Sequence, residues 1–220
     1  MISANSFKFL KALKTNNNKP WFDEHRSEYE TLKKEMSNLC QQVIDEISKF
    51  DKSIIGLEPK DCTFRINRDV RFSKDKSPYK TNVGAYMAKG GKKSDYCGYY
   101  LHIESGKSMM AGGLWMPDAP KLKTARQEID YNFADFKKII DDKKFTNYFG
   151  KIGGEKLVNA PKGYDENNVA IDFLKHKSWV VTHSFSDKEV MDKNFPKIIA
   201  QGGKLMFPFL QFFNQAFTAE

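Results

Sequence analysis

The sequence predicts an α+β fold in a single domain, with an antiparallel sheet of hairpins packed against helices. An apolar series at helical spacing runs from Tyr29 to Phe50, and strand-like stretches separated by short turns fill the middle of the chain. Helical patterns return toward the C-terminus, and no low-complexity linker or internal repeat interrupts the 220 residues. Since one core often extends to about this size, we expect residues 1–220 to form one domain.

The first part of the chain is predicted to be helical. Apolar residues three positions apart predict a short helix that ends at the Asn16-Asn17-Asn18 turn; they are Phe7, Leu10 and Leu13. Pro20 suits the first turn of a second helix, where its missing N–H costs nothing. With the apolar series that follows, this second helix would run for about 28 residues, or roughly 42 Å, and cover the sheet.

A first hairpin is predicted after a turn region that contains Gly56 and Pro59. Residues 63–72 alternate as a strand does, residues 73–80 would connect, and residues 81–88 would return. One face of the first strand would carry Phe64, Ile66, Arg68, Val70 and Phe72. The other face would carry Thr63, Arg65, Asn67, Asp69 and Arg71.

A second hairpin is predicted from residues 96–104 and 107–115, with its turn at Ser105-Gly106. Gly112-Gly113 lies in the later strand. Glycine at such a position marks either a bulge or a place where a ligand or another backbone comes close, and a bulge is the simpler interpretation.

The remainder of the chain is predicted to be mostly helical, with one more strand. The expected elements are helices around 122–129 and 133–150, a helical turn at 172–177, a strand at 179–185, a capping box at Ser186 and Glu189, and a helical tail interrupted near Pro196, Gly202-Gly203 and Pro208. The later helices would join the long helix in covering the sheet.

The most basic stretch runs from Phe64 to Asn82. Within it, six arginines and lysines stand against two aspartates, a net charge of +4 that is half of the chain's +8. The cations are Arg65, Arg68, Arg71, Lys74, Lys76 and Lys80. Such a cluster predicts a surface that holds an anion.

The arginines of this stretch are expected on different faces of the predicted strand and therefore need different partners. Arg65 and Arg71 would share a face with Asp69, which could orient an arginine toward a phosphate or carboxylate; a solvated salt-bridge ladder is the alternative. Arg68 interrupts the apolar face, and an unpaired guanidinium in a core is too costly to persist. We therefore expect Arg68 to meet a buried acid (Glu104 and Asp130 are candidates), a carbonyl cluster or a ligand.

The connecting loop adds Lys76, Lys80 and Tyr79 to this candidate site. A glycine-poor loop with ammonium groups is more typical of a lid or wall than of a backbone phosphate cradle. Lys76 and Lys80 would close over the anion. Tyr79 could stack on a base or sugar, or pack beneath the loop.

Motifs of known chemistry do not appear in the sequence. It contains no GxGxxG, GxSxG or HExxH, and its histidines and cysteines show no metal-ligand spacing, so we expect no cofactor and no metal. Catalytic residues cannot be assigned, and whether the protein is an enzyme stays open. His102 is the one histidine worth following, as a general base beside the glycine pair.

The charge and the cysteine content of the sequence indicate which partners and which cellular compartment to expect. A pI near 9.2 indicates nucleic acid, phosphorylated metabolites or an anionic surface as partners, or a basic surface that serves solubility. Three dispersed cysteines form no disulfide framework and favour a reducing cytoplasm. No signal peptide and no membrane-spanning stretch are expected.

The motifs FRxxRDxRFSKDKxPYKTN, FLxxLxxNNxKxWFxxH, PKGY and PFLxFxN together resemble a widespread bacterial family known only as a conserved domain of unknown function. The matching positions are Phe9-Leu10, 17–22, 65–82, 161–164 and 208–214. This resemblance implies a single α+β domain and implies no activity, cofactor or catalytic residue. It places the basic stretch within the family's signature.

Two functions compete at this stage. The first is a pocket for a small molecule with a phosphate or carboxylate group, bound by Arg65, Arg68 and Arg71, so that Arg68→Ala would abolish binding. The second is a non-catalytic nucleic-acid-binding module, with Tyr79 and Tyr99 as stacking residues. A third possibility is that the apolar C-terminal tail forms a dimer seam, and the oligomeric state stays open.

Overall fold

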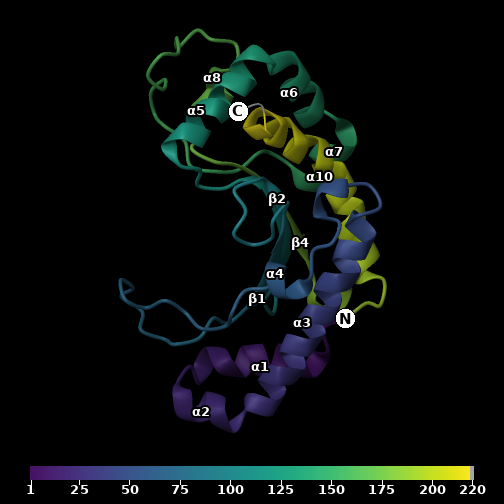
Figure 1. The fold of residues 1–220 in the computed structure, drawn as a ribbon. Coiled ribbons are helices and arrows are strands. Elements are labelled where there is room, and N and C mark those ends of the chain that lie inside the picture. The colour runs from purple at the N-terminus through teal and green to yellow at the C-terminus, as the bar shows by residue number, and fades with distance from the viewer. Residues whose placement is uncertain (219–220) are drawn as a thin grey trace. The chain divides into compact units, whose positions relative to one another are not determined.

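The computed structural model describes residues 1–218 and shows an α+β fold (Figure 1). Its antiparallel sheet has the strand order β1-β2-β3-β4. The strands are β1 (Val83–Met87), β2 (Gly98–Ile103), β3 (Ser108–Leu114) and β4 (Trp179–Phe185). The helices are α1 (Ala4–Thr15), α2 (Lys19–Glu24), α3 (Arg26–Ile47), η1 (Lys52–Ile54), α4 (Pro59–Cys62), α5 (Ala119–Tyr131), α6 (Phe133–Ile140), α7 (Lys143–Phe149), α8 (Ile171–Leu174), α9 (Asp187–Val190) and α10 (Phe195–Thr218). The predicted fold class is confirmed.

The chain forms two compact units. The first comprises residues 1–93, 100–110 and 184–201, and the second comprises residues 94–99, 111–183 and the chain from 202 onward. The expectation of one domain over the whole chain stays a prediction.

In the first unit, the predicted long helix is two helices. α2 ends at His25, whose ring stacks on Trp21 at a centroid distance of 3.9 Å and whose Nδ1 bonds the Trp21 carbonyl oxygen at 2.9 Å. α3 begins directly afterwards and packs against α1, α4 and β1. Its buried face follows the predicted apolar series through Leu32, Met36, Leu39, Val43 and Ile47.

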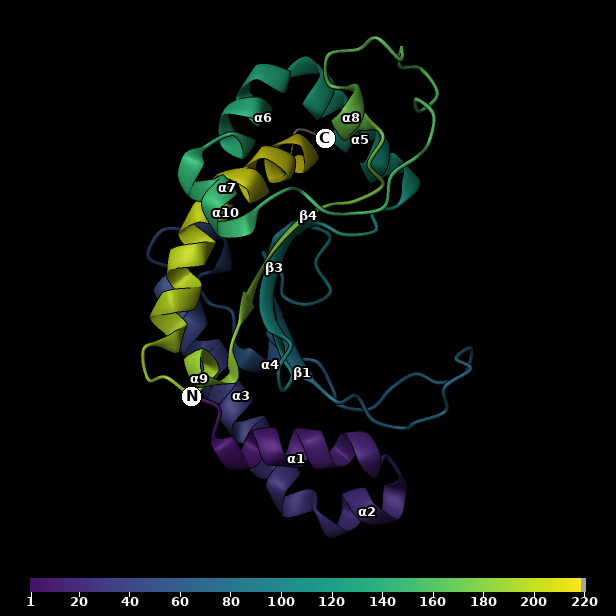
Figure 2. The same ribbon diagram turned by 180° about the vertical axis from the view of Figure 1, so that it is seen from behind.

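The predicted strand at residues 63–72 does not form. Only Thr63 and Asn67 make isolated bridges, to Ala85 and Tyr79, and residues 64–80 run as a long loop that we call the arm (Figures 1 and 2). Phe72 is 96% exposed, because no neighbouring element covers that side of the arm. An alternating sequence becomes a strand only where one face can be buried.

In the second unit, α10 runs unbroken through Pro208, so the predicted interruptions are wrong. An interior proline costs about 3 kcal/mol, and burial of the surrounding aromatic residues offsets that cost. Phe209 and Phe213 are fully buried and lie with Phe212 around Phe136, at ring-centroid distances of 5.0 to 6.3 Å. The phenylalanines expected at a dimer seam therefore belong to the core of this unit.

The predicted helix over 133–150 is also divided, because Asp142 caps the start of α7 with its carboxylate. The second hairpin and the strand at 179–185 form as predicted, as does the capping box of α9.

At Gly113, where φ is +126°, a Cβ would lie 2.1 Å from the Trp179 carbonyl oxygen, and at Gly112 a Cβ would meet the Met206 sulfur at 2.1 Å. The absence of a side chain at Gly112 and Gly113 therefore lets the Met206 side chain and the Trp179 backbone approach this strand closely.

Candidate functional site

The base of the arm, residues 64–67 and 78–80, is tied to the N-terminal helices. The Asn17 side chain donates to the Tyr79 carbonyl at 2.9 Å and accepts from the Tyr79 N–H at 3.0 Å. The Tyr79 ring is 7% exposed and stacks on Phe22 at 3.9 Å. Of the two interpretations of Tyr79, the structure shows packing beneath the loop.

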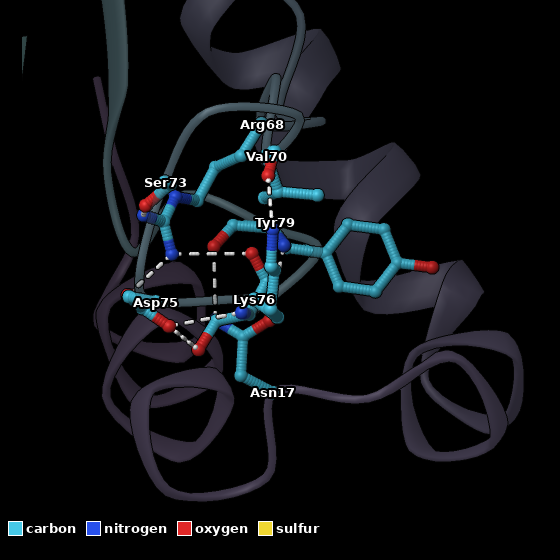
Figure 3. A network of polar contacts seen from close by, with 8 residues as sticks. Asn17, Arg68, Val70, Ser73, Asp75, Lys76 and Tyr79 are labelled. Carbon is cyan, nitrogen blue, oxygen red and sulfur yellow. Dashed lines mark hydrogen bonds and ion pairs between the residues drawn. The ribbon is translucent and has the colours of Figure 1, made fainter.

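The tip of the arm, residues 68–77, pairs its two arginines with its own two aspartates. Arg68 Nη1 pairs with the Asp75 carboxylate and donates to the Ser77 carbonyl at 3.1 Å, and Nη2 lies 3.4 Å from Ser73 Oγ (Figure 3). The acid that Arg68 meets is therefore in its own loop, and neither Glu104 nor Asp130 is its partner. The expected core position is wrong as well, because the Arg68 side chain is 25% exposed.

Asp75 organises this turn. Its Oδ1 accepts hydrogen bonds from the Ser77 backbone N–H at 2.9 Å and from the Ser77 hydroxyl at 2.6 Å. These two bonds, followed by the pairing with Arg68, lower the pKa of Asp75 to about 2. The carboxylate therefore stays charged at neutral pH and holds the tip together.

Two further cations of the tip are engaged within the arm. Arg71 forks onto Asp69, with Nε 3.0 Å from Oδ1 and Nη2 2.7 Å from Oδ2, and this pairing is the main cause that lowers the pKa of Asp69. Lys76 Nζ donates to the Val70 carbonyl at 3.0 Å. Asp69 pairs with Arg71 at an exposed site, which fits the salt-bridge alternative for these two residues.

A cavity of about 420 Å³ opens at the base of the arm. Four of the seven predicted site residues line it, namely Arg65, Arg68, Asp69 and Lys80, whereas Arg71, Lys76 and Tyr79 do not. Asn82 and Tyr100, which sequence reasoning did not select for this site, complete its polar wall.

Two cations of this cavity lack a carboxylate partner within the described part of the chain. No carboxylate oxygen of residues 1–218 lies within ion-pair distance of Arg65 or Lys80. Lys80 Nζ donates to the Arg65 carbonyl at 3.0 Å and lies 5.6 Å from the centre of the Phe64 ring. Burial, and then the charge of Arg65, lower the pKa of Lys80. Two cations therefore lie together at this cavity, with Lys80 partly desolvated and Arg65 exposed.

A chain of hydrogen bonds leads away from the cavity along β2. The Tyr100 hydroxyl lies 3.1 Å from His102 Nδ1, and His102 Nε2 lies 3.1 Å from Glu104 Oε2. A carboxylate acceptor places the proton on Nε2, so Nδ1 accepts from the tyrosine. Burial raises the pKa of Tyr100, which keeps it a neutral phenol at physiological pH. The Tyr-x-His-x-Glu spacing on a predicted strand is the signal that could have revealed this array.

The neighbouring strand leaves room for Tyr100. A Cβ at Gly84 of β1 would lie 3.2 Å from the Tyr100 hydroxyl oxygen and 2.9 Å from the Leu101 carbonyl oxygen. Any larger residue at this position would displace the phenol from the cavity wall. Gly84 is therefore a spacer within the site.

Within residues 1–218, no three His, Cys, Asp or Glu side chains are grouped as metal ligands. In the same range, every helix is too short or too polar to cross a bilayer.

Comparison with known proteins gives a family and no activity. No curated protein and no solved structure matches the chain. One family model, described as a conserved hypothetical protein (DUF2461), matches residues 5–212 and so covers the arm, the cavity and β2. The resemblance seen in the sequence is thus confirmed, and the chain belongs to this conserved hypothetical protein family.

Proposed function

We propose that the cavity at the base of the arm binds the phosphate or carboxylate group of a small molecule. The observation that carries this proposal is the pair of cations, Arg65 and Lys80, that share the cavity without a carboxylate partner in the described chain. Two like charges side by side, one of them partly desolvated, favour an anion that compensates them, since the nearby Asp69 carboxylate is paired with Arg71. The volume of about 420 Å³ falls in the usual range for small-molecule sites, roughly 300–1,000 Å³.

Each lining residue has a distinct role in this proposal. Arg65 directs its guanidinium fork at two oxygens of the anion, and Lys80 supplies a point charge beside it. The Asn82 amide donates to a remaining oxygen, and the Tyr100 hydroxyl, whose hydrogen goes to His102, presents its oxygen to a ligand O–H or N–H. Asp69 repels an anion little, because Arg71 neutralises its carboxylate.

Nucleic-acid binding is the second candidate function for the same basic surface. The two tyrosines expected to stack on bases are buried, with Tyr79 at 7% and Tyr99 at 1% exposure. Without aromatic platforms, a single strand would be held mainly through its phosphates, and its affinity would fall steeply with added salt. We therefore favour the small anion.

The array of Tyr100, His102 and Glu104 favours a catalytic role in addition to binding. Tyr100 lines the cavity and is the residue that would touch the ligand. If His102 Nδ1 takes the phenol proton, the phenol oxygen takes a proton from the ligand, and Glu104 stabilises the imidazolium that forms. We propose proton abstraction from the bound ligand, through Tyr100 to His102, as the chemistry of this site.

We also propose a reducing, cytoplasmic setting. Cys40, Cys62 and Cys97 are buried and free. The thiols of Cys40 and Cys62 share a hydrogen bond, which is the main cause that raises the pKa of Cys40. Adjacent thiols that are not oxidised are typical of cytosolic proteins.

Calorimetric titration tests the binding proposal. The ligands are inorganic phosphate, small phosphomonoesters, small carboxylates and a short oligonucleotide, each at low and moderate salt. The proteins are the wild type, Arg65→Ala and the control Lys74→Ala, which removes one exposed cation from the tip of the arm. We expect a small anion to bind the wild type and Lys74→Ala alike, and to bind Arg65→Ala at least about 30-fold more weakly.

Two results would overturn the proposal. One is the absence of binding by every small anion, and the other is equal affinity for Arg65→Ala and the wild type. Binding of the oligonucleotide alone, lost on addition of salt, would establish the nucleic-acid alternative.

A further inference from the structure

A second, larger cavity adjoins the anion site. It has a volume of about 720 Å³ and lies in the same unit of the protein. Phe64, Arg65 and Val83 belong to the walls of both cavities. A single ligand whose charged group contacts Arg65 can therefore continue from the first cavity into the second.

The floor of this second cavity is apolar. It is formed by Met36 of α3 and Ile66 of the arm, both 3% exposed, together with Tyr29 and the shared Phe64 and Val83. Contacts of this kind favour hydrocarbon, because burial removes apolar surface of both partners from water.

The few polar groups of the lining disfavour a nucleobase or sugar. Among the described residues, no carboxylate or side-chain amide lines this cavity. The Thr63 hydroxyl already donates to the Pro59 carbonyl at 2.8 Å, which leaves the Ser37 hydroxyl as the remaining neutral polar side chain of the lining apart from Tyr29. Apart from these hydroxyls, the neutral side chains of the lining offer no partner to the hydrogen-bonding edge of a base, and burial of unsatisfied polar groups is costly.

Lysines form the charged part of the wall. Lys33, Lys60, Lys92 and Lys93 border the cavity. Lys60 pairs with Glu58, and Lys92 donates to the Lys60 carbonyl at 2.6 Å. Lysine stems extend apolar surfaces while their ammonium groups stay in water, and their charge excludes a cationic tail.

We propose that the ligand is an amphipathic anion, with a phosphate or carboxylate head at Arg65 and Lys80 and an aliphatic chain in the second cavity. This inference rests on the proposed function and adds the class of ligand. The apolar floor supplies affinity that depends on chain length, whereas the two cations supply affinity that depends on the head group. The two contributions are therefore separable by experiment.

The test is a chain-length series measured by calorimetry below the critical micelle concentration. The probes are methyl, butyl and octyl phosphate, with acetate, butanoate and octanoate as a second series and adenosine monophosphate as a base-bearing ligand. We expect the dissociation constant to fall about fourfold for each methylene that enters the cavity. The series with the tighter shortest member identifies the head group.

The outcomes separate this inference from the binding proposal. If methyl phosphate or acetate binds and longer chains bind no tighter, the anion site stands and the aliphatic ligand is wrong. Tighter binding of adenosine monophosphate than of butyl phosphate would also overturn the inference. If no member of either series binds, the binding proposal itself fails.

A pair of variants tests whether the aliphatic chain of the ligand lies in the second cavity. Ser37→Trp fills the second cavity from α3 and leaves the residues of the anion cavity intact, whereas Asn38→Trp places the same ring on the exposed neighbouring position. We expect Ser37→Trp to lose the dependence on chain length while its affinity for the shortest anion is unchanged. Asn38→Trp should behave as the wild type. A dependence retained in Ser37→Trp would contradict the assignment of the chain to this cavity.

Discussion

The base and the tip of the arm have the same net charge, +2, but differ in how their charges are paired. At the tip, Arg68 and Arg71 pair with Asp75 and Asp69. At the base, Arg65 and Lys80 have no carboxylate partner within residues 1–218, and the closest polar contact of Lys80 is a carbonyl oxygen. Lys80 is partly desolvated, whereas Arg65 and most residues of the tip are exposed.

This contrast shows that a count of cations does not identify a binding site. A guanidinium that is neutralised by a neighbouring carboxylate must give up that partner before it can bind an external anion, and the exchange gains little. A cation held without a partner in a concave, partly desolvated place binds an anion at lower cost. The arm therefore has two arginines that pair with its own aspartates, and two cations, Arg65 and Lys80, without such a pairing.

The largest expected effect comes from two double variants that remove the same charge. Arg65→Ala/Lys80→Ala acts at the base, and Arg71→Ala/Lys76→Ala acts at the tip. We expect the base variant to weaken anion binding by more than about 100-fold, because it removes both charge-assisted contacts, and the tip variant by less than about threefold. Calorimetric titration with the anion that binds best measures both. Similar losses would indicate that overall charge, and not the base of the arm, determines binding.

A second, smaller effect concerns the attachment of the base. Asn17→Ala leaves the N–H and the carbonyl of Tyr79 without their side-chain partner, so we expect it to lower the free energy of unfolding by about 1–3 kcal/mol. Asn16→Ala is the control, because its side chain bonds only the exposed Ala12 carbonyl, and we expect it to cost less than about 0.5 kcal/mol. Urea denaturation monitored by circular dichroism compares them. Equal losses would show that Asn17 does not anchor the arm.

A third prediction uses the pKa of Lys80, which burial and Arg65 lower from the ordinary value of 10.5. As pH rises through this lowered pKa, Lys80 loses its charge, and affinity for a carboxylate of constant charge should fall by about tenfold. Lys80→Arg keeps its charge over this range and should show no such loss. Titrations between neutral and alkaline pH measure the effect. An alkaline loss of affinity that persists in Lys80→Arg would assign the titration to another group.

The smallest effect is expected at the tip, at acid pH. Because the pKa of Asp75 is lowered from 3.8 to about 2 in the folded protein, its stabilisation of the tip is complete above the ordinary value and is lost as pH falls through about 2. Nuclear magnetic resonance of the Ser77 amide should report this transition, and Asp75→Asn should remove it. Titration of Asp75 near its ordinary pKa would show that the tip is not held by this carboxylate.

The sequence by itself determined the features that depend on neighbouring residues. Alternation with a Ser-Gly turn predicted the β2–β3 hairpin, and Trp179–Phe185 was predicted as a strand with the bounds that it has. The Ser186 and Glu189 pair predicted the cap of α9. The basic stretch named four residues that line the cavity, although the anion site itself stays a prediction. Periodicity, turn chemistry and capping act over a few residues, so they are visible in the chain.

Only the tertiary structure decided which of these residues act together. The alternation at 63–72 is typical of a strand, yet no element covers Phe72, and the segment stays a loop. Pro208 is typical of a helix end, yet aromatic packing keeps α10 continuous. Asn17 reaches Tyr79 across 62 positions of sequence and thereby sets the base of the arm. The free energy of such contacts comes from burial and desolvation between distant segments, which no local pattern records.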